Sequence, residues 1–116
     1  SKIYRKMDMK TAVIDYALMR NLRVYTINES EIVKIEHPVF KEMRLSIKVM
    51  RGRGFELSLF KNSRYVRKLR IVENLLELKL EICLFETCIS NFVNADIMDD
   101  QTSLFEDMLA NFNLGI

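Results

Sequence analysis

Two segments in the middle of the chain, residues 43–50 and 55–61, alternate apolar and polar side chains with a period of two. This period places every second side chain on one face of a β-strand, so each segment can bury one face and expose the other. Residues 51–54, Arg-Gly-Arg-Gly, connect the segments, and their glycines can adopt the positive φ angles of a tight turn. The pattern predicts an antiparallel hairpin that needs a core on its apolar side.

The segments before this hairpin predict two further strands and a helix. Residues 24–27 and 32–35 are rich in β-branched side chains, and the Asn-Glu-Ser between them suits a turn. Pro38 then interrupts the chain, since proline lacks an amide donor. Residues 3–21 carry apolar side chains at helical spacing, which predicts an N-terminal helix. Its apolar face is expected to contain Ile3, Met7, Ala12, Val13, Ile14, Ala17 and Leu18.

Residues 63–93 contain no glycine and no proline, and two interpretations compete for them. Alternation of apolar and polar residues favours a strand but accounts only for residues 76–84. Helical spacing accounts for the whole segment, so we predict one long helix. One apolar stripe of this helix is Ile71, Leu75, Leu78, Ile82, Phe85, Ile89 and Phe92. A second stripe is Tyr65, Leu69, Val72, Leu76, Leu80 and Cys83.

A helix with two apolar stripes is expected to make contacts on two sides, with the sheet on one and another helix or chain on the other. The residues expected at the interface with a protein partner or a second copy are Ile71, Leu75, Leu78, Ile82, Phe85, Ile89 and Phe92.

The C-terminal part predicts a short helix. Ser103 and Glu106 have the spacing of a capping box, and Gly115 follows the expected end. Two roles remain open for this helix: covering the domain's own core, or docking in a partner's groove. Its apolar face would consist of Leu104, Phe105, Met108, Leu109 and Phe112.

Together these elements predict an α+β fold, in which a small antiparallel β-meander packs against a long α-helix, with further helices at the two ends. Residues 1–116 are expected to form one domain or a fragment of a larger protein. The order of a helix, four strands, a long helix and a short helix resembles the layout of RWD-type interaction domains. That resemblance implies a role in assemblies rather than in catalysis.

The net charge of +2 hides a segregated distribution. Residues 1–40 carry seven basic and five acidic side chains (+2), residues 41–70 carry ten and two (+8), and residues 71–116 carry one and nine (−8). A basic hairpin followed by a basic helix start suggests an alternative function, nucleic-acid or anion binding, with Phe60 and Tyr65 as stacking surfaces. The candidate residues for this site are Lys48, Arg51, Arg53, Lys61, Arg64, Arg67, Lys68 and Arg70.

Residues suited to catalysis or metal binding are sparse. His37 is the only histidine and has no nucleophile assigned to it, so we expect a surface or turn histidine. Cys83 and Cys88 with one histidine fall short of the four ligands of a closed zinc site. On a helix the two thiols point about 140° apart, and we expect them to be buried structural thiols. No enzyme, cofactor or metal is therefore expected.

Two observations bear on location. The longest stretch without charge, residues 87–95, is much shorter than the roughly 20 apolar residues that span a bilayer, so no membrane association is expected. Two unpaired thiols fit a reducing compartment, the cytoplasm or nucleus. The function favoured by the sequence is a non-catalytic protein-interaction or oligomerisation module that assembles through its long amphipathic helix.

Overall fold

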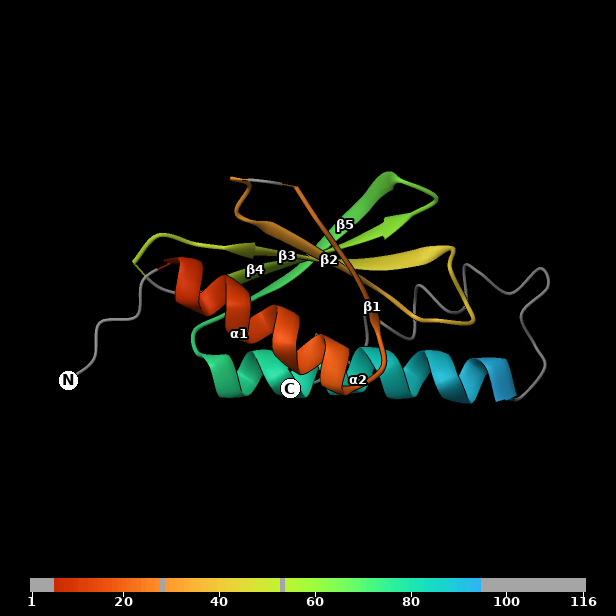
Figure 1. Ribbon diagram of the computed structural model, residues 1–116. Coiled ribbons are helices and arrows are strands. Elements are labelled where there is room, and N and C mark those ends of the chain that lie inside the picture. The colour runs from red at the N-terminus through yellow and green to blue at the C-terminus, as the bar shows by residue number, and fades with distance from the viewer. Residues whose placement is uncertain (1–5, 28, 53, 95–116) are drawn as a thin grey trace.

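The computed structural model describes residues 6–27, 29–52 and 54–94. They form a five-stranded antiparallel sheet in the order β1-β2-β3-β4-β5, and both helices lie on one side of that sheet (Figure 1). This arrangement confirms the predicted α+β class, with a β-meander packed against a long helix. The elements are α1 (Lys6–Met19), β1 (Arg23–Thr26), β2 (Ile32–Glu36), β3 (Met43–Val49), β4 (Phe55–Lys61), β5 (Arg64–Val72) and α2 (Leu75–Asn94).

The central hairpin forms as its alternation predicts. Val49 pairs with Phe55 and Met43 pairs with Lys61, so β3 and β4 are in register along their whole length. The turn between them contains Gly52 and Gly54, with φ angles of 89° and 79°. Every second side chain of the two strands faces the helices and is buried: Met43, Leu45, Ile47, Val49, Phe55, Leu57 and Leu59.

The prediction of one helix over residues 63–93 is wrong for residues 64–72, which form the fifth strand. Asn62 and Ser63 have positive φ angles of 49° and 68°. They make a two-residue turn of the kind that joins antiparallel strands, and asparagine tolerates this conformation better than most residues. The chain therefore reverses at residue 62 and pairs with β4 before any helix begins.

Helix α2 begins after Asn74, where capping interactions fix its first turn. The Glu77 amide donates to Asn74 Oδ1 at 2.8 Å, and Glu77 Oε2 accepts a hydrogen bond from the Glu73 amide at 3.2 Å. This reciprocal cap satisfies two amides that have no partner within the helix. The resulting helix has 20 residues, so it is about 30 Å long at 1.5 Å per residue.

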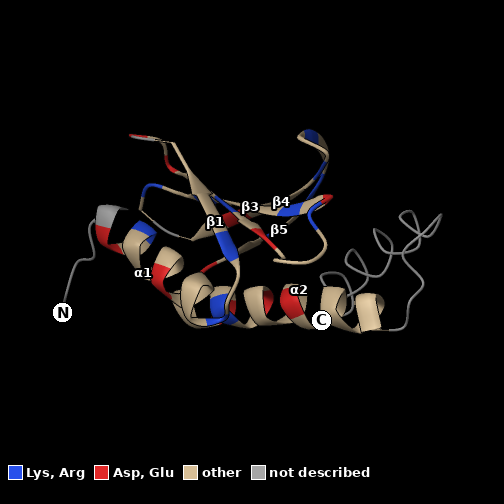
Figure 2. Cartoon of the chain, turned by 45° about the vertical axis from the view of Figure 1, so that its right-hand side comes forward, with Lys and Arg blue, Asp and Glu red and all other residues tan. Residues whose placement is uncertain are grey.

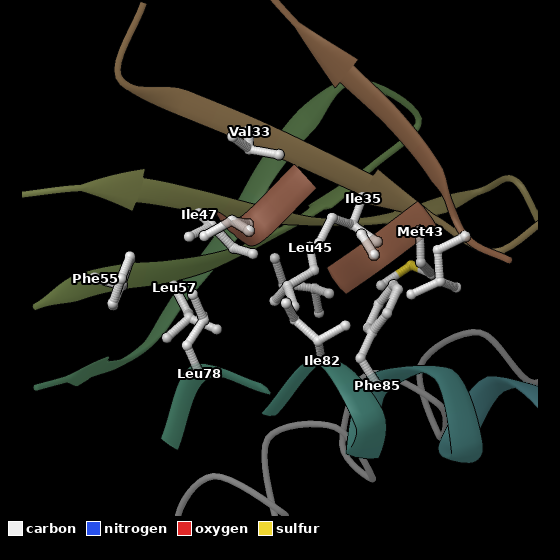
Figure 3. Packing of buried hydrophobic residues seen from close by; sticks show 14 of the residues in the cluster. Val33, Ile35, Met43, Leu45, Ile47, Phe55, Leu57, Leu78, Ile82 and Phe85 are labelled. Atoms are coloured by element: carbon white, nitrogen blue, oxygen red, sulfur yellow. The ribbon is translucent and has the colours of Figure 1, made fainter. Parts of the chain in front are cut away.

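The core lies between the sheet and the two helices. Figure 3 shows Leu78, Ile82 and Phe85 pointing from α2 toward the inner face of the sheet. Helix α1 contributes Val13 and Ala17, both fully buried.

The predicted apolar face of α1 is right for Val13, Ile14 and Ala17, which pack on the core, and wrong for Leu18, which is 54% exposed. Met9 and Tyr16 instead flank Val13 and Ala17 against the core. The predicted C-terminal helix lies outside the described residues.

Candidate functional site

The residues expected to form a protein interface lie mainly inside this chain's own core. Leu75 packs against the core from the first turn of α2, and Ile71 lies on β5 with its side chain exposed. The remaining five residues of the predicted interface are buried between α2 and the sheet, so a partner cannot contact them while the helix stays in place. These buried residues are Leu78, Ile82, Phe85, Ile89 and Phe92.

The side of α2 that faces away from the sheet is also apolar. Leu76 and Leu80, one helical turn apart, are 69% and 58% exposed, and Cys83 and Leu84 are partly exposed beside them. At 100° per residue, Leu80 points about 160° away from the buried Ile82. We call Leu76, Leu80, Cys83 and Leu84 the outer face of α2.

A third side of α2 packs beside α1. The Arg20 guanidinium donates to Glu86 Oε1 from Nη2 at 2.6 Å and from Nε at 3.0 Å. The Lys79 ammonium lies 5.5 Å from the centre of the Tyr16 ring. Among the described residues, the sheet covers one side of α2 and α1 covers another. The outer face is the side that neither of them covers.

A hollow of about 310 Å³ lies beside this outer face, on the flank of α2 next to Arg70 of β5. It is lined by Arg70, Glu77, Leu80, Glu81, Cys83 and Leu84. Arg70 Nη1 donates to Glu81 Oε1 at 3.1 Å. Burial raises the pKa of the Glu81 carboxyl, and the Arg70 charge opposes that rise. Arg70, predicted to contact nucleic acid, is therefore used to hold β5 on α2.

The predicted basic site is divided by the fold, as the separate blue segments in Figure 2 illustrate. Lys48 and Arg51 lie at the β3–β4 turn, whereas Lys61 and Arg64 lie at the β4–β5 turn. These turns are at opposite ends of a seven-residue strand, about 23 Å apart at 3.3 Å per residue.

The remaining basic candidates lie on β5 rather than at a helix start, which corrects that part of the prediction. Lys68 forms an ion pair with Glu56, with 3.4 Å between Nζ and Oε2. Arg67 is exposed. Arg53 lies outside the described residues.

The face of the sheet turned away from the helices carries cations and aromatic rings in contact. Arg44 Nε donates to Glu36 Oε2 at 2.9 Å, while its guanidinium carbon lies 4.0 Å from the centre of the Tyr25 ring. The Lys34 ammonium lies 4.1 Å from the centre of the Phe60 ring. Sequence reasoning identified Phe60 but not Tyr25, Lys34 or Arg44, although the alternation of β1 to β3 places these three residues on one face.

His37 has a structural role at the end of β2. Its Nδ1 accepts hydrogen bonds from the Val39 and Phe40 amides at 3.1 and 3.3 Å, so that nitrogen carries no proton. Its Nε2 therefore carries the proton and donates to Ser90 Oγ on α2 at 3.0 Å. Burial lowers the pKa of His37 below its ordinary value of 6.5, which keeps the ring neutral.

We expect the free energy of unfolding to fall as the pH is lowered through about 6.5, the pKa of an unfolded histidine. The native pKa of His37 is the lower one, so acid protonates the unfolded chain first and stabilises it. Urea denaturation across this range should show the loss in the wild type and not in His37→Asn, which keeps an acceptor but does not titrate. Glu81 has a raised native pKa and acts in the opposite direction, but it is present in both proteins. Parallel pH profiles for the two proteins would contradict this role.

Neither cysteine forms a disulfide. Burial raises the pKa of the Cys88 thiol to about 11, which makes it unreactive at neutral pH. In the described part of the chain, no three histidine, cysteine or carboxylate side chains are grouped so as to hold a metal ion. None of the described helices has the length and apolar character needed to cross a membrane.

Comparisons with protein-family models, with curated protein sequences and with solved structures give no match for this chain.

Proposed function

We propose that this chain is a non-catalytic protein-interaction module that self-associates through the outer face of α2. The observation that supports the proposal best is the exposure of Leu76 and Leu80, at 69% and 58%, on a helix whose opposite side fills the core. Removing a leucine side chain from water is worth about 1.5–3 kcal/mol. Covering an apolar stripe of this kind with a second apolar surface therefore lowers the free energy of the complex.

The spacing of the stripe suits a second copy of the same chain. Leu76 and Leu84 are each four residues from Leu80, so the three leucines are evenly placed about a centre. Two antiparallel copies of α2 would put Leu80 against its counterpart, and each Leu76 against the other copy's Leu84. Such pairing through identical surfaces is the commonest arrangement of homodimers.

Stable interfaces bury about 1,200–2,000 Å² in total, more than three leucines supply, so the stripe would be the centre of a larger contact. The hollow beside Leu80 and Leu84 offers room for a side chain of the partner copy. The sheet and the packing of Arg20 and Tyr16 on α2 hold the helix in one position, which limits the entropy lost on association.

Replacement of Leu80 by glutamate is the direct test, with mass in solution measured by sedimentation of the full chain. We expect an oligomer for the wild type and a monomer for Leu80→Glu, because a charge would face its own counterpart. Leu18→Glu is the matched control, since Leu18 is similarly exposed but lies on α1, and it should keep the wild-type mass. A wild type that is monomeric throughout, or a Leu80→Glu variant that stays oligomeric, would overturn the proposal.

Cysteine crosslinking tests the antiparallel geometry separately. In a Cys83→Ser background, Leu80→Cys should form a disulfide-linked dimer on oxidation, whereas Leu76→Cys alone should not. Mixing Leu76→Cys with Leu84→Cys should restore the crosslink, and crosslinking of Leu76→Cys to itself would instead indicate parallel helices.

A further inference from the structure

The outer face of the sheet, turned away from both helices, is the other large surface of this molecule (Figure 1). Strand pairing places one row of side chains across it, formed by Tyr25, Lys34, Ser46, Ser58 and Lys68. A neighbouring row consists of Arg23, Glu36, Arg44, Phe60 and Tyr65. In the described residues, no helix packs on these two rows.

The charge of this face is predominantly positive. Its acidic side chains are Glu36, bound by Arg44 and Tyr25, and Glu56, paired with Lys68. Both carboxylates are thus partly neutralised where they lie. The cations on the face outnumber them: Arg23, Lys34, Arg44, Lys48 and Lys68.

Planar groups lie on both sides of the same face. Tyr65 is 59% exposed and meets Phe60 edge to face, with ring centres 5.7 Å apart. On the other side the Arg44 guanidinium stacks on the Tyr25 ring at 4.0 Å. Tyr25 on β1 and Tyr65 on β5 are four strand spacings apart, about 19 Å at 4.8 Å each.

Small side chains separate these planar groups. Ser46 and Ser58 occupy the middle of their row, and longer neighbouring side chains cover Ser46, which is 6% exposed. The Lys34 side chain extends from β2 over β3 to the Phe60 ring on β4. Lys34 is half-buried, and its long side chain can leave the ring for an anion at modest cost, because cation–π contacts at solvent-accessible sites are worth about 0.5–1 kcal/mol.

We propose that this outer face binds single-stranded nucleic acid, with bases stacked on Tyr65 and on the Arg44–Tyr25 pair and with phosphates near Lys34 and Lys48. Exposed aromatic rings and arginine planes bind unpaired bases whatever their identity, and cations beside them neutralise the backbone. Phe60 supports Tyr65 from one side and fixes the orientation of its ring. This function is separate from the self-association proposed for α2 and uses the opposite side of the sheet.

The rings favour single strands over two other anionic partners. A duplex keeps its bases stacked inside, so it would use the cations of this face but not Tyr65. An acidic peptide would likewise use only the cations. Binding that depends on the Tyr65 ring therefore distinguishes a single strand from both.

The test is fluorescence anisotropy of labelled oligouridylate and oligothymidylate with the full chain over a range of salt concentrations. Tyr65→Ala should weaken binding about tenfold, since stacking is worth about 1–3 kcal/mol per base and 1.4 kcal/mol is tenfold. Tyr65→Trp should keep the affinity. Lys48→Ala should reduce the slope of log affinity against log salt by about 0.7, the value for one contact to a single strand.

Lys79→Ala is the matched charge control, because Lys79 lies on α2 beside Tyr16, in the helical layer. It should leave both the affinity and the salt slope unchanged. Tighter binding to oligouridylate would identify RNA as the natural class of partner, and tighter binding to oligothymidylate would identify DNA.

Several results would overturn the proposal. These are no binding to either oligonucleotide at low salt, equal affinity of Tyr65→Ala and the wild type, and competition by poly-glutamate as strong as by an unlabelled single strand. Leu80→Glu should bind oligonucleotide like the wild type at saturating protein, so loss of self-association and loss of nucleic-acid binding are separable.

Discussion

Truncation of Phe85 to alanine is expected to lower the free energy of unfolding by about 3–5 kcal/mol, the usual cost of removing a buried phenyl ring. The Phe85 side chain is 3% exposed and points from α2 toward Met43 on the sheet (Figure 3). Alanine would leave a cavity between the helix and the sheet that the surrounding strands cannot close. Urea denaturation followed by circular dichroism measures the loss.

The matched control is Leu76→Ala on the same helix, where the side chain is exposed. Its effect on the stability of the isolated chain should stay within about 0.5 kcal/mol, as for most surface substitutions. The contrast separates the two sides of α2. If Phe85→Ala unfolded at the wild-type urea concentration and only dissociated an oligomer, the assignment of Phe85 to the core would be wrong.

Replacement of Gly54 by alanine is the second substitution expected to have a large effect. Gly54 has a φ of 79°, and a Cβ added there would lie 2.7 Å from the carbonyl oxygen of Val72. The positive φ alone costs a non-glycine residue about 1–2 kcal/mol. Because the obstructing atom belongs to the backbone of β5, either the turn or the end of that strand must move, so we expect a total loss above 2 kcal/mol.

Gly52→Ala provides the control within the same turn. Gly52 also has a positive φ, 89°, but its added Cβ would meet nothing within 4 Å. Its cost should therefore be the φ contribution alone, and the difference between the two variants measures the close approach of the turn to β5. Equal losses of stability would show that Gly54 and Val72 are further apart than 2.7 Å implies.

The strands that sequence alone predicts are those whose alternation is unbroken. Strands β3 and β4 pair residue by residue, so their period of two is visible in the sequence. Strand β5 differs, because its pairing with β4 shifts between Leu57 and Ser58 and again between Leu59 and Phe60. Each shift leaves one extra residue on β5, Leu69 at the first and Val66 at the second.

These shifts explain why the apolar pattern of residues 64–72 predicts a helix. The helical prediction uses Tyr65, Leu69 and Val72, which are four and three residues apart. On the strand, the extra residues at the two shifts interrupt the period of two, so this helical spacing is left as the visible pattern. Asn62 and Asn74 indicate the true boundaries of β5, because the first lies in the turn before it and the second caps the helix after it. Both are single polar residues within a long apolar pattern, so they do not outweigh it.

The candidate surfaces were predictable only in part. The sequence contains two apolar stripes on the long helix, and both have similar composition, so periodicity does not decide which one faces the sheet. The fold decides it, because the helix begins at Leu75 and places Ile82 and Phe85 inward. The outer face of the sheet depends on the pairing of β1 to β5, and its Tyr25 and Arg44 are 19 positions apart in sequence.

The two irregularities in β5 have a consequence for how this protein avoids aggregation. Within the described residues β5 is an edge strand, and an edge presents unpaired amides and carbonyls that can recruit strands of other molecules. Its bulges bend that edge, and the exposed Arg64, Arg67 and Lys68 place like charges along it. The opposite edge, β1, is only four residues long. Both borders of the sheet thus discourage fibril-like growth.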